Sequence, residues 1–344
     1  MRRPLRTHGY RAAAAVVLAC ALTAASQQGA QADPQTLTEV QAKLQSLYHD
    51  AEVATDKYNA ADGKVTAQSK RVSALNAQIR TTEAKLTRLT TLAGAAARAQ
   101  YRGGGVPAEL QFALASDPGR ALDNAGLALQ AQQNTQNLLT DLTATKSALR
   151  TRTDDASAEL ERLRTSRRAM ATQRRTIEQH IAEAKALESS LAAKERARLA
   201  ALEKKTADKA QAKWESTGIL KKVGTDATSA GQKAIAYATR QLGKPYVWGA
   251  EGPDSFDCSG LTSQAWLAAG VAIPRTSEMQ WARLKHVPID EMRPGDLIIY
   301  FSDASHVAIY IGGGDIISAP RPGRVVYVSP AASMQILGVV RPDA

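Results

Sequence analysis

Apolar residues recur at alternating spacings of three and four positions from Leu37 to Leu89 of this 344-residue chain. One set, with members seven residues apart, consists of Leu37, Leu44, Ala51, Tyr58, Val65, Val72, Ile79 and Leu86. A second set, three residues further on, consists of Val40, Leu47, Ala54, Ala61, Gln68, Leu75, Thr82 and Leu89. A repeat sustained over eight heptads predicts a coiled-coil helix, which at 1.5 Å per residue would run for ~80 Å. Such a helix needs another helix along its apolar face.

The stretch RGGGVP at 102–107 interrupts this helix, because glycine and proline are poor helix formers. A second long helix is predicted from about 120 to 215. Its best seam is Leu142, Leu149, Ala156, Leu163, Met170, Ile177, Ala184 and Leu191. Two apolar seams joined by a breaker favour an antiparallel helical hairpin. A dimeric coil would use the same seams, so both arrangements remain open.

Residues 1–32 have the three parts of an export signal. Arginines precede the apolar stretch AAAAVVLACALTAA (12–25), and AQA (30–32) is a small-residue cleavage site. The apolar stretch is too short to span a bilayer. Lipid attachment at Cys20 is the alternative, although the apolar stretch continues past this cysteine. We therefore expect a secreted, extracellular protein that associates with the cell wall.

Composition divides the rest of the chain into three parts. The coiled-coil region is predicted to cover 33–215, including the break at 102–107. Residues 216–231 are rich in Gly, Ser and Thr and lack the heptad, which predicts a linker. Residues 232–344 hold most of the prolines, three of the four tryptophans and short apolar runs of strand length. This last part is predicted to be a compact domain.

The net charge of +11 is unevenly placed. The export signal holds four Arg and no acid, residues 33–230 hold 30 Lys and Arg against 23 Asp and Glu, and residues 231–344 hold ten of each. Nucleic-acid binding favours a compact basic patch with interleaved aromatic residues, so we expect no nucleic-acid partner. The excess in the middle region fits a solvated helix face, and it also fits weak attraction to anionic wall polymers.

Cys258 is the cysteine that remains once the signal is removed, so no intramolecular disulfide can form. CSGLTSQAWLAAG is predicted to be a helix that begins at or just before this residue. The helix dipole and the free N–H groups there favour an anion, which would lower the pKa of the thiol. His306 opens a predicted strand, whereas His286 lies in a stretch that reads as solvated. A catalytic cysteine–histidine pair and a structural role both fit these positions.

Five segments occur in the order and spacing of the NlpC-type cell-wall cysteine peptidase family. They are YVWG (246–249), DCSGL (257–261), IPRTSEMQ (273–280), RPGDLIIY (293–300) and HVAIYIGGGDIISAP (306–320). The resemblance covers the C-terminal domain and implies an α+β papain-like fold, with the nucleophile helix packed on an antiparallel sheet. It implies hydrolysis of the γ-D-glutamyl–diamino-acid bond in peptidoglycan stem peptides, with no cofactor and no metal. The order of signal, coiled coil and this domain resembles cell-separation endopeptidases of Gram-positive bacteria, whose coil masks or positions the catalytic domain.

Carried over to this sequence, the resemblance makes Cys258 the nucleophile and His306 the general base that later protonates the leaving amine. The third catalytic member in the family follows the histidine by twelve residues, as His, Asn, Gln or Glu. Ser318 stands there in this chain, and it would accept a hydrogen bond from the ring and fix its tautomer. Because a hydroxyl is uncharged and short, we expect a working dyad with weaker orientation. Asp315 is the nearest carboxylate, at a predicted turn.

The resemblance also implies substrate-side residues. Tyr246 matches a tyrosine beside the oxyanion or the substrate, where the N–H of Cys258 could act as well. Asp257 and Ser259 match positions that contact polar groups of the substrate, and Arg275 lies in the motif that flanks the groove. Asp257 would alternatively cap the helix.

The expected function is a secreted peptidoglycan hydrolase, a cysteine endopeptidase acting through a thioester in wall remodelling or cell separation. The alternative is a wall-binding coiled-coil scaffold with a weak or inactive peptidase domain, which Ser318 supports. Expected partners are peptidoglycan stem peptides, anionic wall polymers, and a membrane or divisome regulator that binds the coiled coil. The hairpin is expected to regulate access to the site.

Overall fold

The structure is a computed structural model and describes residues 36–102 and 118–344. The predicted export signal, with Cys20, and nearly all of the glycine-rich break lie outside the described residues. Among the helices formed by the described residues, none combines the length and the apolar character that crossing a membrane requires.

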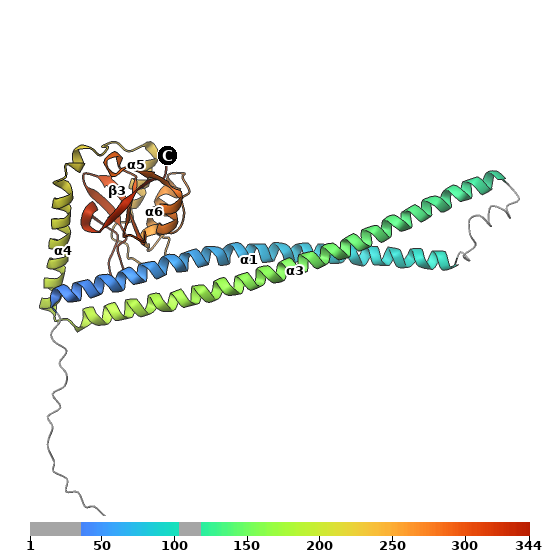
Figure 1. Ribbon diagram of the computed structural model, residues 1–344, viewed down its shortest axis with the longest axis horizontal. Coiled ribbons are helices and arrows are strands. Elements are labelled where there is room, and N and C mark those ends of the chain that lie inside the picture. The colour runs from blue at the N-terminus through green and yellow to red at the C-terminus, as the bar shows by residue number, and fades with distance from the viewer. Residues whose placement is uncertain (1–35, 103–117) are drawn as a thin grey trace, which may run out of the picture.

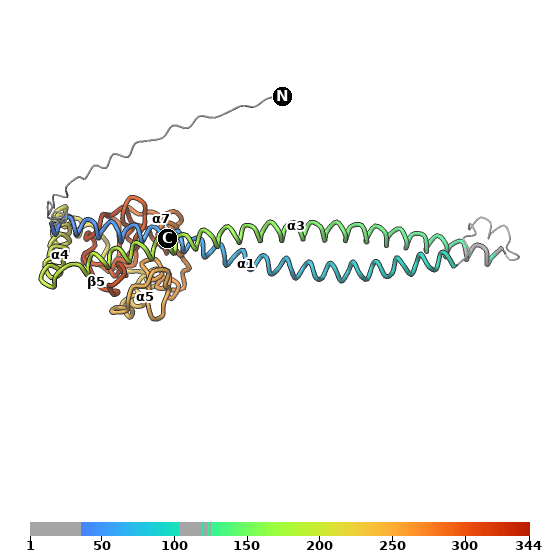
Figure 2. The backbone as a smooth tube through the Cα atoms, turned by 90° about the horizontal axis from the view of Figure 1, so that it is seen from below, coloured from blue at the N-terminus to red at the C-terminus, as the bar shows by residue number. Residues whose placement is uncertain are grey.

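Two long helices, α1 (Leu37–Arg102) and α3 (Pro118–Ser190), lie side by side as an antiparallel hairpin (Figures 1 and 2). Arg71 of α1 bonds to Glu159 of α3 at 2.9 Å, which fixes the register of the pair. The predicted seams meet between the helices, where Leu89, Leu163 and Ile177 are buried. The prediction of a helical hairpin ahead of the C-terminal domain is confirmed.

The second helix is shorter than its seam indicates. It ends at Ser190, and α4 (Ala193–Glu215) begins after the two residues Leu191 and Ala192. The Glu195 carboxylate accepts a hydrogen bond from the Ala192 N–H at 2.9 Å and so caps the new helix. The prediction of one helix to 215 was wrong on this point, because no Gly or Pro marks the break. From there α4 leaves the hairpin and runs beside the C-terminal domain (Figure 1).

The C-terminal domain is built on a six-stranded antiparallel sheet with the order β1-β6-β2-β3-β4-β5. Its strands are β1 (Lys285–Val287), β2 (Leu297–Tyr300), β3 (His306–Gly312), β4 (Asp315–Ser318), β5 (Tyr327–Pro330) and β6 (Ile336–Arg341). Three helices belong to this domain: α5 (Ser229–Thr239), α6 (Cys258–Ala268) and α7 (Ser277–Arg283). Short 3-10 turns lie at Ile219–Lys221, Ile289–Glu291 and Ala331–Ser333.

Both faces of the central strands are buried, because successive side chains point to opposite faces. On one face, Leu297, Ile299 and Val307 pack against α5 and α6, where Leu261 and Trp266 are fully buried. This packing confirms the prediction that the helix beginning at Cys258 packs on an antiparallel sheet.

The second face of the sheet is covered by residues that precede the domain in sequence. Trp214 of α4 and Val223 pack against the cluster that contains Ile298 and Tyr300. Gln211 of α4 donates to the Gly314 carbonyl at 3.2 Å and accepts from the Ala332 N–H at 2.9 Å. Part of the predicted linker also packs on the domain, since the Gly224 N–H donates to the Met292 carbonyl at 2.7 Å. The segment joining α4 to the sheet is therefore part of the folded unit.

Candidate active site

Cys258 is the first residue of α6 and is buried. Asp257 is the N-cap, and its carboxylate accepts a hydrogen bond from the Gly260 N–H at 2.6 Å. Gly260 is required by a close approach, because a Cβ there would lie 2.2 Å from the Ala250 carbonyl oxygen. The DCSG segment thus holds the cysteine at the start of the helix, as the sequence predicts.

His306 opens β3 and pairs with Tyr300 of β2. Its ring is fully buried, and its Nε2 lies 3.1 Å from the hydroxyl oxygen of Ser318, the last residue of β4. Neighbouring strands therefore bring together the histidine and the residue twelve positions later, and the expected ring–hydroxyl contact is present.

The thiol of Cys258 lies against the same strand, where the backbone N–H of Val307 hydrogen-bonds to it. Tyr246 is buried beside the thiol, and burial together with the neighbouring Cys258 raises the pKa of its phenol well above the usual range. The helix start, the strand start and the tyrosine therefore converge on one site.

Asp257, Ser259 and Arg275 form a network beneath the cysteine. The Arg275 guanidinium donates to both Asp257 carboxylate oxygens, at 3.0 and 2.7 Å, and to the Ser259 hydroxyl at 2.9 Å. The side chains of Asp257 and Ser259 are fully buried, and the Asp257 carboxylate also accepts from the Gly249 N–H. In the arrangement described, these residues position α6 and its neighbouring loop. The alternative of a helix cap is therefore realised for Asp257.

Three further residues of the domain lie outside this cluster. Asp315 is exposed at the start of β4, and His286 is exposed on β1, where its ring stacks on Trp281 with centroids 3.8 Å apart. Trp248 is half-buried, and its ring packs edge to face on the ring of Tyr58 of α1, with the ring centroids 5.0 Å apart. Trp248 thus lies at the contact between the domain and the hairpin.

Helix α1 lies across this site. The Glu52 carboxylate is 3.0 Å from Nδ1 of His306. Asp56 accepts hydrogen bonds from the Ser277 hydroxyl and the Glu278 N–H, and Asn59 donates to the Asp257 carboxylate at 3.2 Å. All three α1 side chains are buried. They form one face of the helix, since they are four and three residues apart.

The sequence did not predict that these three residues contact the site, because none of them belongs to the heptad seam. Ala51, Ala54 and Ala61 occupy seam positions in the same stretch, whereas Glu52, Asp56 and Asn59 occupy positions that a two-helix coil exposes to water. In this stretch one face of α1 packs on α3 and the other on the C-terminal domain. The available signal was weak: five acidic residues against two lysines in 36–63.

Both ring nitrogens of His306 have partners. Ser318 contacts Nε2 and Glu52 contacts Nδ1, the other nitrogen that could accept a proton. An ionised Glu52 carboxylate there requires Nδ1 to carry a hydrogen, and a protonated carboxyl would itself bond to the Nδ1 lone pair. Either way, the contact leaves no free lone pair at Nδ1 for the thiol of Cys258.

The expected lowering of the thiol pKa is wrong for this arrangement. Burial raises the pKa of Cys258 well above its ordinary value, and the carboxylates of Asp257, Glu52 and Asp56 add to the rise. Burial likewise raises the pKa of Asp56 to about 8. The helix-start effect is outweighed because the thiol is buried and carboxylates lie near it, two of them from α1.

Two further sets of contacts hold the hairpin on the domain. His49 of α1 lies 3.1 Å from the Asp303 carboxylate and 3.3 Å from the Ser305 hydroxyl, next to His306. Arg321, after β4, bonds to Glu188 of α3 at 3.0 Å and to Glu203 of α4 at 3.3 Å. The same guanidinium stacks over the Tyr48 ring of α1, 4.2 Å from its centroid. We call Arg321 with Tyr48, Glu188 and Glu203 the latch.

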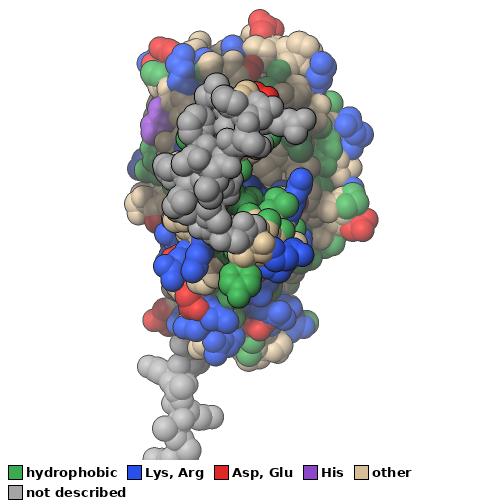
Figure 3. Space-filling model, turned by 90° about the vertical axis from the view of Figure 1, so that its right-hand side faces the viewer, with side chains coloured by type: hydrophobic (Ala, Val, Ile, Leu, Met, Phe, Trp, Pro, Cys, Tyr) green, Lys and Arg blue, Asp and Glu red, His purple; other side chains and the backbone are tan. Residues whose placement is uncertain are grey.

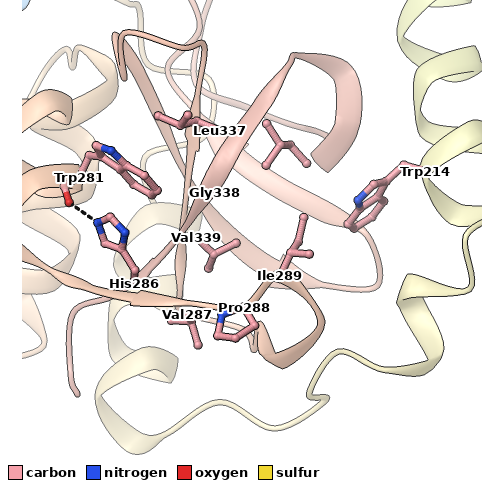
Figure 4. Close-up of a pocket in the computed structure, with 10 residues that line it drawn as sticks. Trp214, Trp281, His286, Val287, Pro288, Ile289, Leu337, Gly338 and Val339 are labelled. Carbon is pink, nitrogen blue, oxygen red and sulfur yellow. Dashed lines mark hydrogen bonds between the residues drawn. The ribbon is translucent and has the colours of Figure 1, made fainter.

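An open groove of about 520 Å³ lies elsewhere on the domain, beside β1 and β6 (Figure 4). It is lined by Trp214, Trp281, His286, Val287, Pro288, Ile289, Ile336, Leu337, Gly338 and Val339. Neither Cys258 nor His306 borders it. In the part of the chain that the structure describes, no three His, Cys, Asp or Glu side chains are grouped so that they could hold a metal ion.

Residues 243–336 match the sequence model of the NlpC/P60 family. The C-terminal domain is an NlpC/P60 domain. A Corynebacterium glutamicum protein named "Probable endopeptidase" is 46% identical over 93 residues, which cover 27% of this chain and 44% of that protein. "Probable endopeptidase p60" of Listeria monocytogenes is 45% identical over 91 residues, 26% of this chain and 19% of that protein.

Among solved structures, the P60 domain of a Mycobacterium avium subspecies paratuberculosis antigen is 34% identical, with a TM-score of 0.31. The match covers 32% of this chain and 92% of that one. The curated relatives named above align over less than half of their length. The likeness therefore concerns the NlpC/P60 domain and its motifs, and the hairpin lies outside it.

Proposed function

We propose that this protein is an exported peptidoglycan hydrolase, a cysteine endopeptidase that cleaves the γ-D-glutamyl–diamino-acid bond of stem peptides in wall remodelling or cell separation. The observation that carries the proposal is the arrangement of Cys258 at the start of α6, His306 at the start of β3 and Ser318 on its Nε2, within an NlpC/P60 domain. The names of relatives called endopeptidases support the same reaction class.

In the proposed reaction His306 acts through Nδ1. If Nε2–H donates to the Ser318 hydroxyl, Nδ1 has a lone pair and accepts the proton of the Cys258 thiol. The thiolate then attacks the amide carbonyl carbon, and the C–S bond forms as the carbonyl electrons move to oxygen. The Cys258 N–H at the helix start and the Tyr246 hydroxyl are the proposed donors to that oxyanion.

The intermediate collapses to a thioester as the C–N bond breaks, and the proton on His306 passes to the leaving amine of the diamino acid. Water then attacks the thioester carbon as His306 takes a proton from it. The C–S bond breaks, the product leaves as a carboxylic acid that ionises, and His306 returns its proton to the sulfur of Cys258. No electron transfer and no metal enters this scheme.

We further propose that α1 keeps the enzyme closed in the arrangement described. Glu52 occupies Nδ1, Asn59 occupies the Asp257 carboxylate, and Asp56 bonds to Ser277 and the Glu278 N–H at the start of α7. These contacts use the groups that would face a substrate. Activity then requires the hairpin to move away from the domain. The regulator expected at the coiled coil is a proposed source of that movement.

The test of the proposed reaction uses defined muropeptides and mass spectrometry. The mature chain 33–344 carrying Glu52→Ala, which opens Nδ1, should release stem fragments that end in D-glutamate. The double variant with Cys258→Ala should release none. Products that arise from cleavage of another bond would contradict the assignment of the γ-D-glutamyl–diamino-acid bond. Binding to sacculi with no product at long incubation would favour the non-catalytic scaffold.

The test of closure compares two fragments. Residues 193–344 keep α4, whose Gln211 and Trp214 cover the second face of the sheet, and lack α1 and α3. This fragment should cleave muropeptides at least about tenfold faster than chain 33–344, because the closing contacts include a charge-assisted bond that contributes roughly 1.5–3 kcal/mol. Equal rates would rule out closure by α1.

A further inference from the structure

The hairpin has two electrically different parts. Residues 36–63 of α1, which lie against the NlpC/P60 domain, hold five acids and two lysines. Residues 64–102 of the same helix hold eight cations and a single acid, Glu83. The eight are Lys64, Lys70, Arg71, Arg80, Lys85, Arg88, Arg98 and Arg102. The excess charge that composition spreads over the coiled-coil region is therefore concentrated on one part of α1.

This outer half of α1 lies away from the domain. It continues α1 beyond the domain, and at 1.5 Å per residue its 39 residues extend for roughly 55 Å (Figure 1). All eight cations are exposed. In the part of the chain that the structure describes, Arg71 alone among them is paired with a carboxylate, that of Glu159. We call residues 64–102 of α1 the basic shaft.

The neighbouring stretch of α3 adds to this charge. Residues 142–168 hold seven cations and four acids, and five of those cations bond to no carboxylate within the described residues: Lys146, Arg150, Arg152, Arg167 and Arg168. In Figure 3, which looks at the molecule from the far end of the hairpin, Lys and Arg side chains gather in the lower half of the face. The acids nearby do not neutralise the shaft.

The eight cations lie on the outward face of α1, and exposed cations of α3, such as Arg150 and Arg168, lie on the other helix of the hairpin. With the seam at Val65, Val72, Ile79 and Leu86, the eight residues occupy the heptad positions b, c, f and g, and none lies on the seam. A flat anionic bilayer would meet only one side of such a rod and leave the other cations in water. A flexible chain can contact cations on several sides, releasing counterions at each contact.

We propose that the basic shaft binds a flexible polymer of phosphodiester-linked units in the cell wall. This inference rests on the proposed export of the protein, and it is independent of the proposed reaction, since neither Cys258 nor His306 takes part. Its function would be to hold the molecule in the wall while the NlpC/P60 domain, at the other end of the hairpin, stays free of polymer. The acids of residues 36–63 would repel the same polymer from the covered active site.

The experiment measures binding of chain 33–344 to lipid-free poly(glycerol phosphate) over a series of salt concentrations. A shaft variant carries Lys70→Gln, Arg80→Gln, Lys85→Gln and Arg88→Gln. The matched control carries Lys205→Gln, Lys209→Gln, Lys221→Gln and Lys222→Gln, four exposed cations outside the hairpin. Gln is a good helix former, so circular dichroism should be unchanged in both variants.

We expect binding that weakens steeply with salt, and a loss of about tenfold or more for the shaft variant at about 0.1 M salt, with little loss for the control. For flexible single strands, each phosphate contact contributes about 0.7 to the slope of log affinity against log salt. The loss of four cations should therefore reduce the magnitude of this slope by roughly three. Cleavage of muropeptides by the opened enzyme should be equal in all three proteins.

Three outcomes would overturn the proposal: no binding at about 0.1 M salt, equal losses in the two variants, or stronger binding to vesicles of equimolar phosphatidylglycerol and phosphatidylcholine at the same phosphate concentration. The last result would assign the shaft to a membrane surface. Because the readout is binding, failure here is distinguishable from failure of the proposed reaction.

Discussion

Glu52 of α1 bonds to Nδ1 of His306, on the opposite side of the ring from Ser318. These residues are 254 positions apart in the chain, and both are buried. The helix that covers the site therefore makes one of its shortest contacts with the group proposed to take the thiol proton.

Replacing Glu52 by Ala should open the site. The change removes a buried charge-assisted hydrogen bond, which contributes roughly 1.5–3 kcal/mol, so the open population should rise about tenfold or more. Alkylation of Cys258 by iodoacetamide in chain 33–344 should accelerate accordingly. Glu83→Ala, an exposed acid of the same helix, is the control and should leave the rate unchanged. An unchanged rate in Glu52→Ala would mean that this contact does not keep the site closed.

Arg321→Ala should weaken the latch. The guanidinium bonds to Glu188 and Glu203 and stacks on Tyr48, so its loss removes one contact with the domain from each of α1, α3 and α4. We expect faster Cys258 alkylation, by about threefold to tenfold, since partly exposed ion pairs contribute little individually. Arg283→Ala, an exposed arginine of α7, is the matched control. Equal behaviour of the two variants would show that the latch adds nothing to closure.

Ser318→Ala should slow the opened enzyme. The hydroxyl is the partner of Nε2, and without it the buried ring loses the contact that fixes its tautomer. In the Glu52→Ala background, kcat should fall about fivefold, as for the loss of one neutral hydrogen bond, with KM little changed. A kcat equal to that of the parent would place Ser318 outside the mechanism. A larger loss would make the hydroxyl as important as a charged third residue.

Docking of α1 should weaken as pH rises. The pKa of Asp56 is raised to about 8 in the docked state, against an ordinary value of 3.8, because the carboxyl is buried. The docked helix thus holds a proton that the released helix gives up. The free energy that favours docking therefore decreases between about pH 4 and pH 8 and is constant above that range. The effect cannot exceed about tenfold per pH unit.

Spin labels at Lys43 of α1 and Lys285 of the domain, both exposed, would measure the distance between α1 and the domain. The measurement would use a Cys258→Ala background at pH 5, 7 and 9. The fraction of molecules with a long distance between the two labels should increase with pH. Asp56→Asn, which cannot ionise, should remove this trend between pH 5 and 8. A trend that survives in Asp56→Asn would assign the dependence to another group.

Asp257→Asn should destabilise the NlpC/P60 domain. The carboxylate is fully buried against the Arg275 guanidinium, and removing one partner of a buried ion pair costs about 3–5 kcal/mol. Urea unfolding followed by tryptophan fluorescence would measure the change. Asp254→Asn, an exposed acid three residues earlier in the same loop, should change stability by less than about 0.5 kcal/mol.

The sequence predicted the parts of this molecule that are local or carried by motifs. The seams at Leu89 and Leu163 predicted the hairpin, and DCSGL predicted Cys258 at a helix start. The position of Ser318, twelve residues after His306, predicted their contact across β3 and β4. In each case the spacing along the chain determines which side chains meet.

The sequence could not predict what lies on the site. Glu52, Asp56 and Asn59 occupy heptad positions that a two-helix coil exposes, and their partners lie about 200 or more residues away. A polar side chain at such a position gives no sign of which surface it will meet. The rise in the Cys258 pKa follows from burial of the thiol and from the nearby carboxylates of Asp257, Glu52 and Asp56, whereas the helix start alone predicted a lower value.

The short break at Leu191 and Ala192 determines how the covering helix can leave. Since α4 stays bonded to the sheet through Gln211, this break is where α1 and α3 would turn away from the domain. A displaced α1 then remains attached to the domain it covered, at an effective concentration on the order of millimolar. Re-covering would be intramolecular and independent of protein concentration. Each molecule would therefore carry its own reversible off-state, and only a cut in the chain between α3 and the sheet would make the open state permanent.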